Sequence, residues 1–126
     1  MANLLSFSDL EVWKAARELR ILISELVSKF PKDEKFRLAD QILRSSRSVT
    51  ANIAEGFGRF HHQENIQFCR HARGSLHETL DHLILAYDEK FITKENFEEL
   101  RDKVLNVTKI LNGYILYLKK AKELDK

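Results

Sequence analysis

The sequence predicts an all-α protein that folds as one antiparallel up-down-up-down four-helix bundle covering residues 1–126. Only four glycines and one proline interrupt the chain, and so few helix breakers favour long helices over a sheet with many turns. Apolar residues recur at alternating steps of three and four, the period of helices that bury one face. The links between these segments are short, which makes neighbouring helices antiparallel. The expected helices span about 8–30, 34–57, 62–88 and 94–123.

The first helix has the clearest start signal. Ser8 and Glu11 have the spacing of a capping box, and Phe7 and Val12 have that of a hydrophobic staple around it. Pro31 ends the helix, because proline lacks a backbone donor and clashes with the preceding turn. The inward stripe is Val12, Ala16, Leu19, Ile23, Leu26 and Phe30.

The second helix is expected to start after Asp33, a residue type that caps helix N-termini, and to end at Gly56 and Gly58. These glycines follow a helix and not a strand, so they are interpreted as a helix stop and not as a phosphate-binding loop. The inward stripe is Leu38, Ile42, Val49 and Ile53.

The third helix begins at His61 or His62, which are weak caps, whereas Thr93 caps the fourth helix with Ile92 and Phe97 as its staple. The third helix is expected to point Cys69, Ala72, Leu76, Leu80, Leu83 and Tyr87 inward. The fourth is expected to point Phe97, Leu100, Val104, Val107, Leu111, Tyr114 and Leu118 inward.

Apolar residues extend beyond these stripes on the first and last helices. The first helix adds Ile21 and Leu22. The fourth adds Ile110, Ile115, Leu116 and Tyr117. A wider apolar arc than one bundle core requires predicts contacts between subunits.

Polar and small residues form a stripe beside the core on the second and third helices. The stripes are Gln41, Ser45, Ser48, Asn52, Glu55 and Arg59, and Glu64, Phe68, His71, Ser75, Glu78 and His82. Gly74 lies beside them, and an interior helical glycine, which costs about 1 kcal/mol relative to alanine, suggests that another group comes close. One interpretation is a structural network in which buried polar groups satisfy one another: Asn52, Glu55, Arg59 and Glu78. The other is a surface that faces a ligand or another subunit.

No catalytic or metal site is expected, and no cofactor. His71, Ser75 and Glu78 share a helical face, but a serine in mid-helix has no free backbone N–H groups nearby for an oxyanion hole. No histidine has an acidic residue three positions before it, as a di-iron bundle requires, and no two histidines have the spacing of a helical zinc pair. Cys69, on the core stripe, is expected to be an inert buried thiol.

Positive charge gathers in the second and third helices. The stretch 44–73 holds five arginines and only two acids, and these arginines are predicted to contact a nucleic-acid backbone: Arg44, Arg47, Arg59, Arg70 and Arg73. The net charge of +2 permits such binding without requiring it. A second basic run is expected to be a solvated helix end, because lysines suit a helix C-terminus: Lys119, Lys120, Lys122 and Lys126.

The compartment expected is the cytoplasm. The single Cys69 cannot form an internal disulfide, which fits a reducing compartment. The N-terminal stretch has neither the charged region nor the long apolar region of a signal peptide. No apolar run approaches the roughly 18 residues that a membrane span needs.

Three segments resemble the four-helix-bundle proteins encoded in intervening sequences of bacterial 23S rRNA genes. They are 7–16, FSDLEVWKAA, then 52–59, NIAEGFGR, and then 74–78, GSLHE. They occur in the family's order, and the likeness covers nearly the whole chain. The same fold is similar to the accessory protein of diversity-generating retroelements. This sequence departs from the pattern in the turn at 88–91, which lacks the glycine expected there.

The resemblance implies a homo-oligomeric ring, commonly a pentamer. For the retroelement relative it also implies a basic surface that binds nucleic acid and a reverse transcriptase. Matched motif by motif, the family's patch falls on Arg44, Ser45, Ser48, Asn52, Glu55, Gly56, Arg59, Gly74, Ser75 and Glu78.

The leading hypothesis is therefore a non-enzymatic, ring-forming bundle that binds RNA or single-stranded nucleic acid through backbone contacts. The alternative is a protein-interaction scaffold that binds no nucleic acid, in which the polar stripes and the wide apolar face serve assembly only.

Overall fold

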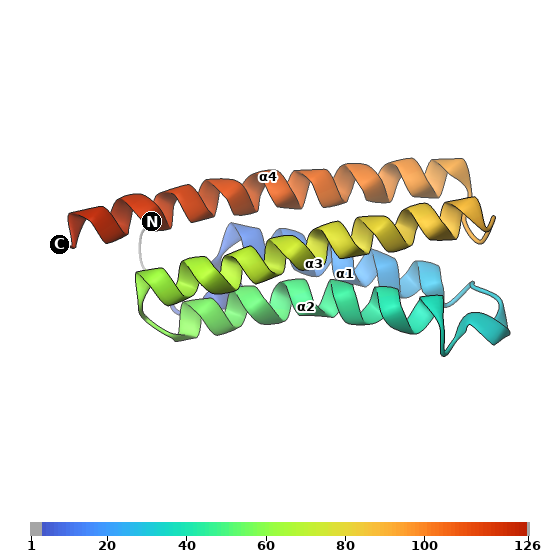
Figure 1. Cartoon of the computed structure of the whole chain (residues 1–126), viewed down its shortest axis with the longest axis horizontal. Helices are drawn as coiled ribbons and strands as arrows, with labels where there is room; N and C mark the ends of the chain where they lie inside the picture. Colours follow the sequence, from blue (N-terminus) through green and yellow to red (C-terminus); the bar gives the residue numbers. More distant parts are fainter. Residues whose placement is uncertain (1–3, 126) are drawn as a thin grey trace.

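The computed structural model describes residues 4–125. Its long helices are α1 (Glu11–Val27), α2 (Leu38–Gly58), α3 (His62–Asp88) and α4 (Lys94–Leu124), and two short 3-10 helices, η1 (Phe7–Asp9) and η2 (Lys32–Glu34), precede α1 and α2. The four long helices lie side by side and alternate in direction (Figure 1). Each packs against two others, in the cyclic order α1, α2, α3, α4. The prediction of an all-α four-helix bundle is confirmed.

The contact between α2 and α3 is the most extensive in the bundle, and the contact between α1 and α4 is the least. The α1 helix begins, and the α4 helix ends, at the end of the bundle where α2 passes into α3 (Figure 1). The links from α1 to α2 and from α3 to α4 lie at the opposite end. No helix within the described range is long and apolar enough to cross a membrane.

The start of α1 differs from the prediction. The capping box is Ser6 with Asp9, and it closes η1: the Ser6 Oγ accepts the Ser8 N–H at 3.0 Å, and an Asp9 carboxylate oxygen accepts the Ser6 N–H at 3.1 Å. Leu10 then adopts an extended conformation, and α1 begins at Glu11 without a side-chain cap. The predicted Ser8–Glu11 box is wrong, because the chain leaves the helical conformation between its two members.

Two other helix boundaries also differ. The α1 helix ends at Val27 and not at Phe30, although Phe30 is buried with the rest of the predicted stripe. The α2 helix begins at Leu38, well after the predicted cap Asp33, because Asp33 belongs to η2 and only Arg37 occupies the cap position. A Glu34 carboxylate oxygen accepts the Leu38 N–H at 3.3 Å and partly replaces the missing cap.

The sequence predicts that α2 ends at Gly56 and Gly58. Gly58 is the last residue of the helix, but Gly56 lies within it. The residue with positive φ that turns the chain is Phe60, at 52°. Gly56 instead brings α2 close to α3: a Cβ there would lie 2.7 Å from the Asn65 Oδ1 and 2.9 Å from the Phe68 Cβ. Gly74, predicted to mark a close approach, lies in open space, because a Cβ at this position would have no neighbour within 4 Å. That prediction is wrong.

The core follows the predicted stripes closely. On α3 the exception is Tyr87, which is 38% exposed and stacks on Phe97 at 4.9 Å, while Ala86 points inward in its place. Thr93 caps α4 as predicted, its side chain accepting the Asn96 N–H at 3.1 Å. The turn between α3 and α4, which lacks a glycine, places Lys90 at a φ of 64°.

Candidate functional site

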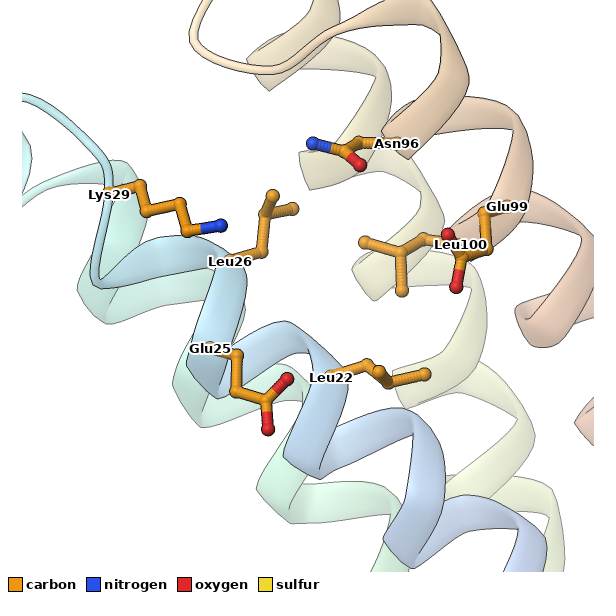
Figure 2. Close-up of a pocket in the computed structure, with 7 residues that line it drawn as sticks. All are labelled: Leu22, Glu25, Leu26, Lys29, Asn96, Glu99 and Leu100. Atoms are coloured by element: carbon orange, nitrogen blue, oxygen red, sulfur yellow. The ribbon is translucent and has the colours of Figure 1, made fainter.

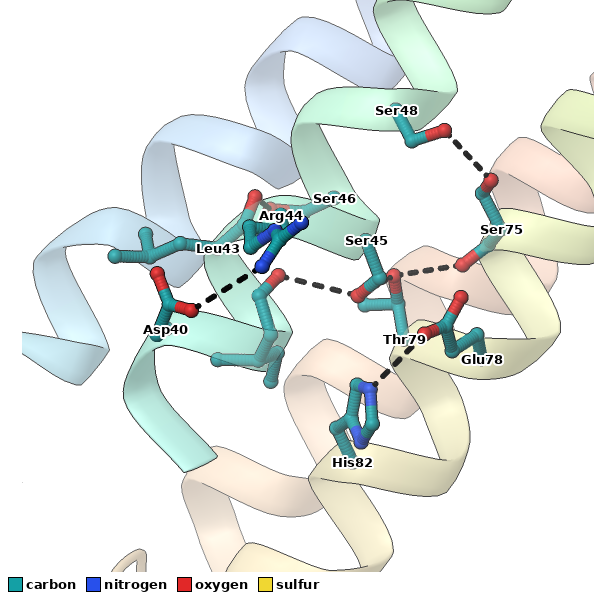
Figure 3. A network of polar contacts seen from close by, with 11 residues as sticks. Asp40, Leu43, Arg44, Ser45, Ser46, Ser48, Ser75, Glu78, Thr79 and His82 are labelled. Carbon is teal, nitrogen blue, oxygen red and sulfur yellow. Dashed lines mark hydrogen bonds and ion pairs between the residues drawn. The ribbon is translucent and has the colours of Figure 1, made fainter. Parts of the chain in front are cut away.

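Five polar side chains form a seam between α2 and α3, which we call the polar seam: Ser45, Ser48, Asn52, Ser75 and Thr79. Figure 3 shows all of them except Asn52. The Ser75 hydroxyl donates to the Ser48 Oγ at 2.9 Å, and the Asn52 amide donates to the same oxygen at 2.9 Å. One turn away, the Thr79 and Ser45 hydroxyls lie 2.9 Å apart. Because Ser45 and Thr79 are buried and bonded to each other, this geometry supports the structural interpretation of the stripes.

The charged members of the stripes do not join the polar seam. Arg59 donates to a Glu55 carboxylate oxygen at 2.8 Å, and Glu78 lies 3.4 Å from the His82 Nε2. Of the four residues predicted to satisfy one another, Glu55 and Arg59 do so, whereas Asn52 bonds to Ser48 and Glu78 lies beside His82. Each acid finds its partner four residues along its own helix, where spacing brings side chains together. The His82 Nε2 is buried without a hydrogen bond, so its contact with Glu78 is an ion pair only when the imidazole is protonated.

A second buried polar group, which the sequence analysis missed, links α3 to α4. Asn65 donates to the Tyr114 hydroxyl at 3.1 Å and lies 3.6 Å from the Cys69 sulfur, whose thiol donates to it. Burial raises the pKa of the Cys69 thiol to about 12, so the thiol stays protonated and unreactive. Burial also raises the pKa of Tyr114. The sequence could have revealed Asn65 by its position, because the residue lies on the inward face of α3.

The residues singled out as tempting for catalysis do not meet. The Ser75 hydroxyl donates across the polar seam to Ser48, and His71 is exposed with its ring 6.0 Å from that of Phe68. Between residues 4 and 125, no cluster of three or more His, Cys, Asp or Glu side chains could hold a metal ion.

A hollow between α1 and α4 mixes apolar and charged residues (Figure 2). Leu22, Leu26 and Leu100 lie beside Glu25, Glu99 and Lys29 with Asn96 at one side, and the volume is about 120 Å³. That is below the roughly 300 Å³ typical of small-molecule sites, and the charges do not converge on one point.

The five arginines of the hypothesis occupy different sides of the bundle. Arg44 is exposed on α2 and lies 3.6 Å from Asp40, and Arg47 is exposed on the same helix. Arg59 lies over the Phe68 ring at 5.2 Å. Arg73 and Arg70 instead face α4, since Arg73 donates to the Asn112 side-chain oxygen at 2.7 Å and Arg70 lines a hollow shared with α4.

The hollow that Arg70 lines is rich in positive charge, and we call it the basic groove. It has a volume of about 280 Å³ and lies between the start of α3 and the end of α4. Its lining is Gln63, Ile66, Arg70, Lys119, Lys120, Lys122 and Glu123. Three of the tail lysines, expected to be merely a solvated helix end, thus share a groove with Arg70, while Lys126 lies outside the described residues. Four cations against one acid make the groove a candidate for binding anions.

A second hollow, of about 340 Å³, adjoins the basic groove at the α2–α3 turn. The two share Gln63 and Lys122, whose side chains contact each other. The remaining lining is Phe60, His61, His62 and Asp125. His62 and Asp125 pair through a 3.0 Å contact between the Nδ1 and a carboxylate oxygen.

These features define a class of protein. It is a helical bundle in which the buried polar groups of the polar seam join the helices, and in which the charged side chains, including those of the basic groove, lie on the surface. The chain belongs to the 23S rRNA-intervening sequence protein family, whose model matches residues 8–113. The match includes the polar seam and Arg70 and ends before the lysines of the basic groove.

A solved structure agrees with this assignment. The chain is similar to a protein of unknown function from the S23 ribosomal protein family of Bacteroides thetaiotaomicron, with a TM-score of 0.77 and 28% sequence identity. The likeness covers 82% of this chain and 97% of that one. No curated protein sequence matches this chain.

Proposed function

We propose that this protein is a non-enzymatic bundle that forms a homo-oligomer and binds nucleic acid through phosphate contacts in the basic groove. The observation that carries the proposal is the groove's lining of four cations and one acid, formed by two helices. Cations aligned along a groove displace the counterions of a nucleic-acid backbone, which drives binding at low salt.

The groove residues suit different parts of this task. Lys119 and Lys122 lie one turn apart on α4 and offer point charges to successive phosphates. Arg70, on α3, can hold a phosphate through two N–H groups at once. Arg44 and Arg47 would extend the contact only for a strand long enough to pass along α2.

The experiment is a titration of a labelled single-stranded RNA at several salt concentrations, with wild type and the double variant Lys119→Ala/Lys122→Ala. If both lysines contact phosphates, affinity falls and the slope of log affinity against log salt becomes shallower by about 1.4, since each contact contributes about 0.7 on a single strand. The matched control is Lys29→Ala/Lys32→Ala, which removes two exposed lysines at the opposite end of the bundle. Equal affinities for the two double variants would contradict the proposal.

A scaffold without nucleic-acid binding is the second candidate. It is favoured by apolar side chains that remain exposed on the outer helices: Ile21 on α1, and Leu105, Leu116 and Tyr117 on α4, which are 41%, 50%, 53% and 46% exposed. Light scattering with and without RNA separates the two functions. A scaffold gives an oligomer whose mass is independent of RNA at every salt concentration.

A further inference from the structure

Phe60 presents an aromatic ring to solvent. Its side chain is 86% exposed, although it is a phenylalanine in a chain with an ample core. Its backbone φ of 52° lies in the left-handed region, which aromatic residues rarely adopt. The turn therefore places a large apolar ring in solvent, at a backbone position whose conformation favours glycine.

The surroundings of Phe60 are polar, and Lys122 brings one positive charge to them. Its ring lies 6.2 Å from that of Phe57, at a tilt of 57°, so the inner side is supported and the rest faces outward. It lines the hollow at the α2–α3 turn, which joins the basic groove through Gln63 and Lys122. The carboxylates that line the two hollows are Glu123, in the basic groove, and Asp125, which pairs with His62 at 3.0 Å.

We infer that the α2–α3 turn is a stacking site for an unpaired base of a single-stranded nucleic acid, with the Phe60 ring as the platform and Lys122 next to the adjoining phosphate. This inference rests on the proposed function and adds the substrate class to it. A base offers a flat apolar face within a few bonds of a phosphate, and the turn offers a ring in the same hollow as Lys122. Bases in a duplex have their faces covered by their neighbours, so only a single strand can use the ring.

A protein partner fits this place less well. An apolar ring that docks into a protein is usually surrounded by further apolar surface, whereas the residues that line the hollow with Phe60 are His61, His62, Gln63, Lys122 and Asp125. The amide of Gln63 can instead exchange hydrogen bonds with a base edge, and either imidazole can do the same.

The test compares Phe60→Ala, Phe60→Trp and a control, Phe36→Ala, for binding a uridine-rich RNA strand and an RNA duplex of equal length. Phe36 is a matched control because it is 84% exposed and lies on the link between η2 and α2, at the other end of the bundle. Loss of one base–aromatic stack should weaken single-strand binding by roughly five- to 150-fold in Phe60→Ala. The salt dependence should stay that of wild type, because no charge is removed. Phe36→Ala should bind like wild type.

Phe60→Trp keeps a ring and should restore single-strand affinity, and its added tryptophan fluorescence should be quenched as the strand binds. Thermal unfolding followed by circular dichroism identifies any variant that fails to fold; Phe60→Ala loses no buried contact and should melt no lower than wild type. If Phe60→Ala binds the single strand as wild type does, while Lys119→Ala/Lys122→Ala weakens it, the stacking site is refuted and the proposed function survives. If wild type binds neither RNA at low salt, both fail. Equal weakening of strand and duplex by Phe60→Ala would also overturn the inference.

Discussion

Two glycines within helices have opposite environments: Gly56 is closely surrounded and Gly74 is open. We therefore expect opposite effects when each is replaced by alanine. A methyl group at Gly56 would lie 2.9 Å from the Phe68 Cβ and 3.2 Å from the Asn65 backbone oxygen, neither of which can rotate away. We expect Gly56→Ala to lower the free energy of unfolding by about 1–3 kcal/mol, because α2 and α3 must separate. Urea denaturation monitored by circular dichroism measures the change.

Gly74→Ala provides the matched comparison. The position is open, helical and without positive φ, so alanine should raise the free energy of unfolding by up to about 1 kcal/mol through its higher helix propensity. If the two variants changed stability in the same direction, the close approach at Gly56 would not be what requires its glycine.

Cys69 makes stability depend on pH in the alkaline range. Burial raises the pKa of its thiol from 9.0 to about 12 in the folded protein, so between these values the unfolded chain has lost the proton and the folded chain has kept it. The unfolded state then binds fewer protons, and the free energy of unfolding falls by up to about 1.4 kcal/mol per pH unit as pH rises. Below pH 9.0 the contribution is fully present. Tyr114, whose pKa burial also raises, acts in the same direction.

Cys69→Ala isolates the thiol's part of this dependence. Its stability should be lower at neutral pH, because a cavity replaces the sulfur, but its loss of stability above pH 9.0 should be less steep than that of wild type. Denaturation curves across the alkaline range give both slopes. Parallel slopes would mean that the thiol titrates at its ordinary value in the folded protein.

At the scale of helices, the polar seam couples α2 to α3. The Ser45 and Thr79 hydroxyls lie 2.9 Å apart, and both residues are buried. Removing one hydroxyl therefore leaves the other without this hydrogen bond. We expect Thr79→Val and Ser45→Ala each to lower the free energy of unfolding by about 1–2 kcal/mol, and the double variant to lower it by about 1 kcal/mol less than their sum. Additive effects in this double-mutant cycle would show that the hydroxyls do not stabilise one another.

Helix interiors could be predicted from this sequence better than helix ends. Burial follows the helical period, so the stripe from Val12 to Phe30 is buried as expected even though α1 stops at Val27. The choice of cap depends instead on where a single residue leaves the helical conformation. Leu10 does so, and the capping box moves from Ser8 to Ser6.

The polar seam was predictable in its residues but not in its partners. Ser45, Ser48, Asn52 and Ser75 break the apolar rule in register, and periodicity alone places them beside the core. Which hydroxyl meets which across the interface depends on the axial offset between α2 and α3, which periodicity along one helix does not give. Gly56 allows α2 to approach Asn65 and Phe68 of α3 closely. Thr79 was missed because its residue type is compatible with any helical face.

At the scale of the whole molecule, the basic groove arises only from the fold. Arg70 and the α4 lysines are far apart in the sequence, and the antiparallel pairing of α3 with α4 brings them together. Counting charge along the chain grouped Arg70 with Arg44 and Arg47 instead, because proximity in sequence was the only measure available. A surface shared by two helices is invisible to such a count.

The α1–α4 side is where we expect copies of this chain to meet. These two helices make the least extensive contact in the bundle. Besides the hollow of about 120 Å³ shown in Figure 2, a second and mostly apolar hollow of about 250 Å³ lies between them. Its lining is Leu10, Glu11, Val12, Ile110, Gly113, Tyr114 and Tyr117. Tyr117 is 46% exposed and stacks on Tyr114 at 6.2 Å, so its ring is held at the mouth of the hollow. A second copy that covers this hollow would bury apolar surface that a lone subunit leaves in water.

The substitution Tyr117→Lys tests this assembly. A lysine there removes the ring and places a charge where the partner's apolar surface would lie, so light scattering should give a lower mass than wild type at equal concentration. Leu85→Lys is the matched control, because Leu85 is 42% exposed but lies on α3, away from this hollow, and its mass should equal that of wild type. Both variants should keep the wild-type helical content, since each side chain is largely outside the core. If Leu85→Lys dissociates the oligomer and Tyr117→Lys does not, subunits meet through α3, and the hollow between α1 and α4 remains a solvent-facing surface in the assembly.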